Sequence, residues 1–236
     1  MHGLEAALDE ARAMAAAVEA QPPAARVALC PPFTLIRRLA DLLAGTSIEI
    51  GAQDCRAEAQ GAFTGDIAAE MLADAGATLV ILGHSERRAG HGESDALVAA
   101  KAQAALRAGL EPIVCVGETL AQRQAGDTLA VVTAQVLGSL PDELEGHAFC
   151  IAYEPVWAIG SGLTPTVEQI KEVHAAIRAT LSDRFAGQGS ATPILYGGSV
   201  KPANAAEILR LPNVGGALVG GASLKAADFM PIFQAL

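Results

Sequence analysis

One stretch of the sequence decides the fold class: Phe149-Cys150-Ile151-Ala152-Tyr153-Glu154-Pro155-Val156-Trp157-Ala158-Ile159-Gly160-Ser161-Gly162. Its first five residues are apolar, which predicts a strand buried on both faces, as in a parallel sheet. Glu154 then stands at the carboxyl end of that strand, where apolar walls would raise its pKa toward that of a useful base. The loop that follows places Trp157, the chain's only tryptophan, between a stiff proline and two flexible glycines. This pattern predicts a movable lid beside a carboxylate, and an ordinary surface turn is the alternative.

Short apolar runs of this kind recur along the chain, separated by longer stretches with helical spacing. Thr166 and Gln169 form a capping box before one such stretch, which is apolar at Ile170, Val173 and Ile177. Regular alternation of buried strands and helices predicts a parallel sheet covered by helices. The seven expected strands are 27–30, 48–52, 79–82, 113–116, 149–153, 194–196 and 217–219.

Polar residues that follow the strands distinguish a barrel from an open sheet. An open sheet would gather them at one switch point, whereas a barrel builds its site from the ends of many strands. Here they follow six of the seven strands, which predicts an α/β fold of the TIM (β/α)8 barrel type as a single domain over residues 1–236. These residues are Gln53, His84, Glu118, Glu154, Gly197-Gly198-Ser199 and Gly220-Gly221.

The chain opens with a helical pattern, so eight expected helices face seven expected strands. We therefore expect the first strand of the barrel to be absent from this chain. Either the barrel is open, or the sequence begins inside the first strand–helix unit.

Composition excludes several classes of function. The chain of 236 residues is 51% hydrophobic and 18% charged, and its formal net charge is −10. Its 16 Lys and Arg residues are outnumbered and unclustered, which argues against binding to nucleic acid or to an anionic membrane. The N-terminus has no signal-peptide pattern and no apolar run has the length of a membrane span, so we expect a cytoplasmic protein. The four separated cysteines, Cys30, Cys55, Cys115 and Cys150, are expected to be buried free thiols of a reducing compartment.

A histidine follows the strand 79–82 in the segment Gly83-His84-Ser85-Glu86-Arg87-Arg88. Backbone N–H groups at the start of a helix would disfavour an imidazolium, so a neutral His84 could donate a hydrogen bond to a substrate carbonyl. The alternative is a histidine that only caps the turn, with Glu86 paired to Arg87 or Arg88 on the surface.

Two glycine-rich turns follow the last two strands, at Gly197-Gly198-Ser199 and Gly220-Gly221. Their backbone N–H groups can converge on a phosphate without a lysine or an arginine, at the position where barrels of this kind bind phosphate. Each pair alone would also fit an ordinary tight turn. Motifs for dinucleotides, P-loops, zinc proteases and serine hydrolases are missing from the sequence. We expect no metal and no organic cofactor, and we expect His91, His147 and His174 to be surface or half-buried side chains.

A carboxylate base, a neutral histidine, an anion site and a lid together describe proton transfer next to the carbonyl of a small phosphorylated compound. Three motifs in order, Leu82–Arg88, Tyr153–Gly162 and Tyr196–Val200, resemble the triosephosphate isomerase family, and the similarity runs the length of the chain. That family is itself a standard example of a glutamate base that acts with a neutral histidine. The resemblance implies interconversion of dihydroxyacetone phosphate and D-glyceraldehyde 3-phosphate through an enediolate, without a cofactor.

The resemblance also implies roles for single residues. Glu154 would be the base and His84 would polarise the carbonyl, with Ser85 and Glu86 in the same catalytic segment. Gly160, Ser199, Gly220 and Gly221 would bind the phosphate. The lid would comprise Pro155, Val156, Trp157, Ala158, Ile159, Gly160, Ser161 and Gly162, continued by Leu163 and Thr164, and Tyr196 and Ser199 would hold it closed. Cys115 would pack beneath the base. A loop from Gln53 to Asp66, with Phe63, Thr64 and Gly65 near its tip, would insert into a second subunit of a homodimer.

The sequence departs from the family pattern at its start. The Asn-x-Lys element of the family's first strand has no counterpart here, and the four lysines, Lys101, Lys171, Lys201 and Lys225, match positions away from the site. Losing a cation aimed at a dianionic substrate would cost at least a few kcal/mol of transition-state stabilisation. A sheet without its first strand would also expose two edges and favour association. A non-catalytic barrel that binds phosphorylated ligands or dimerises is therefore the alternative function, and another phosphosugar enzyme is a third, remote one.

Overall fold

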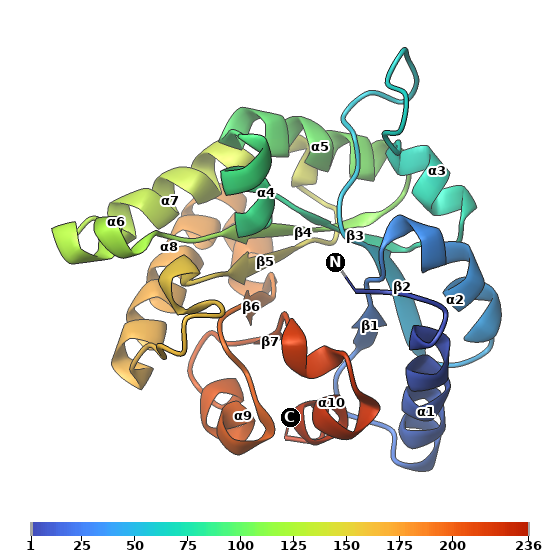
Figure 1. Cartoon of the computed structure of the whole chain (residues 1–236). Coiled ribbons are helices and arrows are strands. Elements are labelled where there is room, and N and C mark those ends of the chain that lie inside the picture. The colour runs from blue at the N-terminus through green and yellow to red at the C-terminus, as the bar shows by residue number, and fades with distance from the viewer. Residues whose placement is uncertain (1, 236) are drawn as a thin grey trace.

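The structure is a computed structural model, and it describes residues 2–235. A curled sheet of seven parallel strands lies at the centre, with helices around its outer face (Figure 1). Neighbours in the sheet are neighbours in the sequence, in the order β1-β2-β3-β4-β5-β6-β7. The strands are β1 Val27–Leu29, β2 Ile48–Ala52, β3 Leu79–Leu82, β4 Glu111–Val116, β5 Cys150–Tyr153, β6 Ile194–Tyr196 and β7 Gly216–Ala217.

The seven predicted strands are confirmed, and three of them, β2, β3 and β6, have the predicted bounds. The last strand is the poorest match, because it covers Gly216–Ala217 and not 217–219. Strand β4 begins two residues earlier than predicted, at Glu111, whose side chain is partly buried. Apolar runs locate a buried strand well, but they miss the polar residue with which such a strand begins.

Ten α-helices and four 3-10 helices lie between and after the strands in residues 2–235, more than the eight helices predicted. The α-helices are α1 Ala7–Ala20, α2 Ile36–Leu42, α3 Ala69–Asp74, α4 Ser85–His91, α5 Asp95–Arg107, α6 Leu120–Ala125, α7 Thr128–Ser139, α8 Val167–Ala191, α9 Pro202–Leu209 and α10 Ala226–Phe233. The 3-10 helices are η1 Phe33–Leu35, η2 Asp142–Leu144, η3 Val156–Ala158 and η4 Gly221–Ser223. The extra elements arise because two of the expected strand-to-strand stretches are each split into two helices, α4 with α5 and α6 with α7.

The capping box predicted for Thr166 and Gln169 is confirmed at the start of α8. The apolar residues of that helix face the sheet, and Ile170, Val173 and Ile177 are all buried. The helix is interrupted at Phe185 and Ala186, and Ala186 has a φ of 44°. Its long amphipathic first part therefore covers the sheet next to the lid.

Two edges of the sheet approach one another without pairing. Within residues 2–235, β1 pairs with β2 alone and β7 with β6 alone. Helices α1 and α10 pack across this seam (Figure 1). Glu10 on α1 joins them, since its carboxylate accepts from Lys225 Nζ at 2.7 Å and from the Ala226 backbone N–H at 2.9 Å. The barrel-type prediction is confirmed as an α/β fold, but the described strands form a curled sheet and not a closed barrel.

The core has two parts, one on each face of the curled sheet. The larger lies between the strands and the helices, and the smaller lies inside the curl. The inner part is built from small and medium side chains: Leu79, Ile81, Ile113, Cys115, Cys150 and Ala152. Among the described helices, we find none with the length and apolar character needed to cross a membrane.

Candidate active site

Glu154 lies directly after β5 and is almost completely buried, with 2% of its side chain exposed. Its backbone N–H donates to the Val116 carbonyl of β4 at 2.8 Å, which fixes the main chain at the carboxyl ends of the two strands. The carboxylate accepts from the Ser85 backbone N–H at 2.9 Å and from Ser85 Oγ at 3.1 Å. The prediction of apolar walls around this carboxylate is therefore wrong, because three polar donors from the segment after β3 surround it, His84 being the third.

His84 and Glu154 meet directly. His84 Nε2 lies 2.9 Å from Glu154 Oε1, and the backbone N–H of Glu86 donates to His84 Nδ1 at 3.3 Å. A nitrogen that accepts from a backbone N–H carries a lone pair, so this contact fits a neutral ring with its proton on Nε2. Burial lowers the pKa of His84, but the hydrogen bond and the charge of Glu154 outweigh it and raise the pKa overall. The contact to Glu86 supports the predicted neutral tautomer of His84. The pKa of His84 is raised, however, whereas the sequence predicted that the imidazolium would be disfavoured.

The catalytic segment predicted after β3 is the N-terminus of α4. His84 is the N-cap residue of this helix, and Ser85, its first residue, is buried. Glu86 is exposed, and among residues 2–235 its carboxylate forms no ion pair with Arg87 or Arg88. The alternative of a surface pair between Glu86 and either arginine is thus wrong.

Arg87 instead joins a buried ionic cluster behind the segment. Its guanidinium bonds Asp54 at 2.8 Å and Glu93 at 2.7 Å. Lys101 Nζ lies 2.7 Å from Asp54 and 2.6 Å from Glu93. Burial of the Asp54 carboxyl raises its pKa. The cluster links the start of the Gln53–Asp66 loop to α4 and α5.

Two glycines of the turn after β6 allow close approach of the main chain, Gly197 to Glu154 and Gly198 to Tyr196. A Cβ at Gly197 would lie 2.9 Å from Glu154 Cγ, and a Cβ at Gly198 would clash with the Tyr196 hydroxyl. The Gly197 N–H donates to the Tyr153 carbonyl at 2.7 Å. A larger residue at Gly197 would push the turn away from the base, and one at Gly198 would push it away from Tyr196 and Pro155. Close approach therefore explains this glycine pair at least as directly as anion binding does.

The lid segment is docked on Glu118, a fully buried residue just after β4. Trp157 Nε1 donates to Glu118 Oε1 at 2.8 Å, and the Val156 N–H donates to the Glu118 carbonyl at 3.1 Å. The Tyr153 hydroxyl lies 3.1 Å from Glu118 Oε2, and Arg123 Nη1 lies 3.6 Å from Oε1. The later half of the lid is exposed, including Ile159, Gly160, Ser161 and Gly162. Sequence reasoning placed Glu118 at a strand end but gave it no role.

The four predicted phosphate residues lie in three separate segments. Gly160 is in the exposed part of the lid, Ser199 follows β6, Gly220 is the N-cap residue of η4, and Gly221 is its first residue. No hydrogen bond within residues 2–235 joins Gly160 to the other three. The Tyr196 hydroxyl, predicted to hold the closed lid, is buried and has no hydrogen-bond partner in the described part of the chain. Convergence of these groups on a phosphate stays a prediction.

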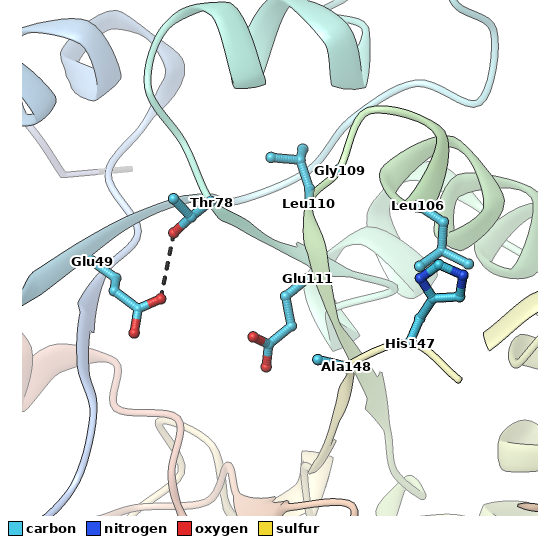
Figure 2. A pocket seen from close by; sticks show the side chains of 8 residues that line it. All are labelled: Glu49, Thr78, Leu106, Gly109, Leu110, Glu111, His147 and Ala148. Atoms are coloured by element: carbon cyan, nitrogen blue, oxygen red, sulfur yellow. Dashed lines mark hydrogen bonds between the residues drawn. The ribbon is translucent and has the colours of Figure 1, made fainter. Parts of the chain in front are cut away.

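A cavity of about 320 Å³ lies at the amino-terminal ends of β3, β4 and β5, opposite to the end that carries Glu154. Figure 2 shows the residues that line it. The carboxylates of Glu49 on β2 and Glu111 on β4 enter it from either side of β3, and Thr78 Oγ1 lies 3.5 Å from Glu49. Arg26 bridges both carboxylates at 2.8 Å. This cavity contains no predicted site residue. Its lining residues are Glu49, Thr78, Leu106, Gly109, Leu110, Glu111, His147 and Ala148.

The other histidines and the cysteines bear on the remaining predictions. His91 and His147 are exposed as predicted, but His174 is completely buried, so that prediction is wrong. All four cysteines are free; three are buried and Cys30 is half-buried. Residues 2–235 hold no group of three or more His, Cys, Asp or Glu side chains arranged to bind a metal ion.

Comparison with known proteins identifies strong similarity over the whole chain. The family model described as triosephosphate isomerase matches residues 1–236. The triosephosphate isomerase of Caulobacter vibrioides is 63% identical over 236 residues, covering 100% of this chain and 93% of the relative. That of Ruegeria pomeroyi is 60% identical over 237 residues, covering 100% and 94%. The crystal structure of triosephosphate isomerase from Bartonella henselae superposes with a TM-score of 0.93 at 47% identity, covering 100% of this chain and 94% of that one.

Proposed function

The chain belongs to the triosephosphate isomerase family, and on that premise we propose that Glu154 and His84 interconvert dihydroxyacetone phosphate and D-glyceraldehyde 3-phosphate on a single barrel domain. One observation carries the assignment of these residues. The Glu154 carboxylate and His84 Nε2 lie 2.9 Å apart at the carboxyl ends of β5 and β3, the end of the sheet where barrels of this kind bind substrate.

The reaction balances within the substrate. Glu154 removes a proton from the carbon next to the carbonyl. The electron pair of that C–H bond forms a C=C bond, and the carbonyl π electrons move to the oxygen to give an enediolate. Return of the proton to the neighbouring carbon forms the new C–H bond, and one oxygen gains the proton that the other loses. Because one carbon is oxidised as its neighbour is reduced, the chemistry requires no external oxidant or reductant.

His84 supports this reaction as a hydrogen-bond donor. With Nδ1 accepting from Glu86 N–H, the ring has its proton on Nε2, which faces the carboxylate and would face a substrate oxygen placed there. A preorganised donor at the oxygen that becomes negative contributes more to the transition state than to the ground state. The substrate has to separate His84 from Glu154 to occupy this position.

The lid and the glycine turns would hold the phosphate. The lid from Pro155 to Gly162 is anchored at its first half and exposed at its second. We propose that closure brings Gly160 to Ser199, Gly220 and Gly221, with Tyr196 supplying a lid contact through its hydroxyl, which has no hydrogen-bond partner among residues 2–235. Water exclusion by such a lid strengthens the electrostatic interactions inside the site.

A homodimer is the assembly that we propose. The loop between β2 and α3 extends away from the sheet (Figure 1), and Arg56 shapes it by stacking over Phe63 at 3.6 Å and pairing with Asp66 and Glu58. Thr64 and Gly65 are exposed at its tip, while Gln53 turns back and donates to the Cys30 carbonyl at 3.0 Å. Thr64→Arg should shift a dimer to monomer in analytical ultracentrifugation, whereas Thr46→Arg, away from the loop, should not.

The four free thiols support a cytoplasmic location, because proteins of oxidising compartments pair their cysteines. Burial raises the pKa of Cys30, Cys55 and Cys150 to about 12, and the pKa of Cys115 well above its ordinary value. Such thiols stay protonated and unreactive in the folded protein.

A non-catalytic phosphate-binding barrel is the second candidate, and the placement of the lysines favours it. Lys101 is buried in the ionic cluster, Lys225 pairs with Glu10, Lys171 lies on the surface of α8, and Lys201 is the N-cap residue of α9. Within residues 2–235, no lysine therefore faces Glu154 or His84. A closed eight-stranded barrel, which the family leads us to expect, would need a further strand between β7 and β1.

A steady-state assay with D-glyceraldehyde 3-phosphate separates the two candidates. Glu154→Ala is the blank, and Glu172→Ala, an exposed change on α8, is the matched control. Turnover well above the blank in the parent chain and in the control supports the isomerase. If all three proteins lack turnover while the parent still binds dihydroxyacetone phosphate by calorimetry, the non-catalytic candidate holds.

A further inference from the structure

Arg88 on α4 has an unusual set of partners for a residue next to the site. Its guanidinium donates to the Gly83 carbonyl at 2.9 Å and to the Cys115 carbonyl at 3.1 Å. It also donates to Asp95 Oδ1 at 2.6 Å and to Ser139 Oγ at 2.9 Å. The side chain is 15% exposed, so these four acceptors replace most of the water that the charge would otherwise bind.

The two carbonyls belong to the main-chain segments behind the two catalytic groups. Gly83 immediately precedes His84 and has a φ of 64°, the left-handed turn that directs the chain from β3 into α4. Cys115 lies in β4 beside Ala152 of β5, and Ala152 is two residues before Glu154. One guanidinium thus ties the start of the His84 segment to the strand that supports Glu154.

The other two partners hold the guanidinium in place. Asp95, in the first turn of α5, accepts from both Arg88 and the hydroxyl of Ser139, the latter at 3.1 Å. Ser139 is completely buried at the end of α7. Because two acceptors fix the plane of the guanidinium, its remaining N–H groups have a fixed direction toward the two carbonyls.

We propose that Arg88 is a positioning residue for the isomerase reaction, which sets the distance between His84 and Glu154 by joining the Gly83 turn to β4. The inference rests on the proposed function. Arg88 touches neither catalytic side chain, so it acts through the main chain. A lysine cannot replace it fully, because one ammonium group on a flexible stem cannot reach both carbonyls and Asp95 in a fixed geometry.

Three variants test this role: Arg88→Gln, Arg88→Lys and Ser139→Ala. The matched control is Arg184→Gln, since Arg184 also bonds a main-chain carbonyl, that of Leu137, and an aspartate, Asp142, but neither belongs to the segments that carry His84 or Glu154. The measurements are kcat and KM for D-glyceraldehyde 3-phosphate, and the pKa of His84 from its ring proton shifts, assigned by their loss in His84→Gln.

We expect Arg88→Gln to lower kcat on the order of 10–100-fold, as a small misplacement of catalytic groups does, with KM changed by less than about threefold. Arg88→Lys should recover part of kcat, and Ser139→Ala should show a smaller loss in the same direction. The pKa of His84 should fall in each variant, because its contact with Glu154 loosens, and should not change in Arg184→Gln.

The pKa of His84 keeps this test separate from that of the proposed function. If the parent chain has no turnover, the isomerase proposal fails, but a lower pKa of His84 in the folded Arg88 variants still supports the positioning role. If Arg88→Gln does not fold, Arg88→Lys and Ser139→Ala give the same two measurements. The proposal would be overturned if Arg88→Lys and Ser139→Ala both fold and both keep the kcat and the His84 pKa of the parent.

Discussion

His84 Nε2 and Glu154 Oε1 lie 2.9 Å apart, so the two side chains proposed to act on a triose phosphate hydrogen-bond one another directly. Ser85 holds the other carboxylate oxygen through its backbone N–H at 2.9 Å. Both groups thus have hydrogen-bond partners within the protein, and the carboxylate of Glu154, at 2% exposure, is buried with a donor at each oxygen. The arrangement keeps the base ordered until a substrate oxygen replaces Glu154 as the acceptor of the hydrogen bond from His84.

Removing the charge of Glu154 should lower the pKa of His84. The raised pKa depends on the hydrogen bond and charge of Glu154, so in Glu154→Gln the opposing effect of burial should take the pKa below its ordinary value. The change should also reduce kcat by about 10²–10⁴-fold, the usual contribution of a general base. An NMR pH titration of the His84 ring measures the first effect. Glu172→Gln is the control, and an equal His84 pKa in Glu154→Gln and the parent would contradict the argument.

The lid should report its own movement through Trp157. Its indole donates to the buried Glu118 carboxylate at 2.8 Å, and we expect a lid that closes over the phosphate to break this contact. Because the chain has a single tryptophan, its fluorescence should change when dihydroxyacetone phosphate binds. Glu118→Gln keeps an acceptor but removes the charge, which weakens the docked state by about 1 kcal/mol and should tighten apparent binding about fivefold. A ligand titration followed by fluorescence tests both points, and unchanged emission at saturation would show that Trp157 stays on Glu118.

The sequence predicts the fold well because the strands are buried on both faces. Apolar runs locate all seven, and the polar residues that follow them bring Glu154 and His84 to one end of the sheet. The polar surroundings of Glu154 were not predictable in this way. Ser85 becomes a partner through the direction of a helix N-terminus 69 residues away in sequence, and no local pattern encodes that direction.

Two further errors concern polar side chains. Arg88 and His174 both stand in amphipathic stretches, where a polar residue normally marks the solvent face. His174, however, lies four residues after Ile170 and three before Ile177, so its spacing places it on the buried stripe. That signal was present in the sequence. For Arg88 no such signal exists, since its partners are carbonyls and residues of three other elements.

The contact across the seam should depend on the ionisation of Glu10. Hydrogen bonds from Lys225 and from the Ala226 N–H lower the pKa of this carboxyl. The folded-state pKa of Glu10 thus lies below the unfolded value of about 4.5. The ionised carboxylate therefore stabilises the folded protein fully at a pH above that unfolded value, and this stabilisation is lost as the pH falls through the folded-state pKa. Glu10→Gln should therefore lower Tm by a few degrees or less at pH 7, on the order of small-domain shifts, and by less near pH 3. Circular dichroism melts measure the difference, with the exposed Glu19→Gln on the same helix as control; an equal loss at both pH values would show that charge is not the cause.

His174 should make the folded protein sensitive to mild acid. The ring is completely buried, and its Nδ1–H donates to the Asn213 carbonyl at 3.1 Å. It packs edge-on against Tyr153, with ring centroids 5.8 Å apart. Burial lowers the pKa of His174 to about 4. Between this value and the unfolded value of about 6.5, the unfolded chain binds more protons, so stability falls as the pH is lowered through that window.

The pKa of His174 sets the size of this effect at about 2 kcal/mol between pH 7 and pH 5. His174→Gln removes the titrating ring and keeps a donor that can reach the Asn213 carbonyl. Between pH 7 and pH 5, the decrease in its free energy of unfolding should therefore be smaller than the parent's decrease by about 2 kcal/mol. Urea denaturation at pH 7, 6 and 5 measures the two curves. His147→Gln, at an exposed histidine, should follow the parent. Parallel curves for His174→Gln and the parent would mean that the ring is protonated in the folded state or that water reaches Nε2, for which residues 2–235 supply no hydrogen-bond partner.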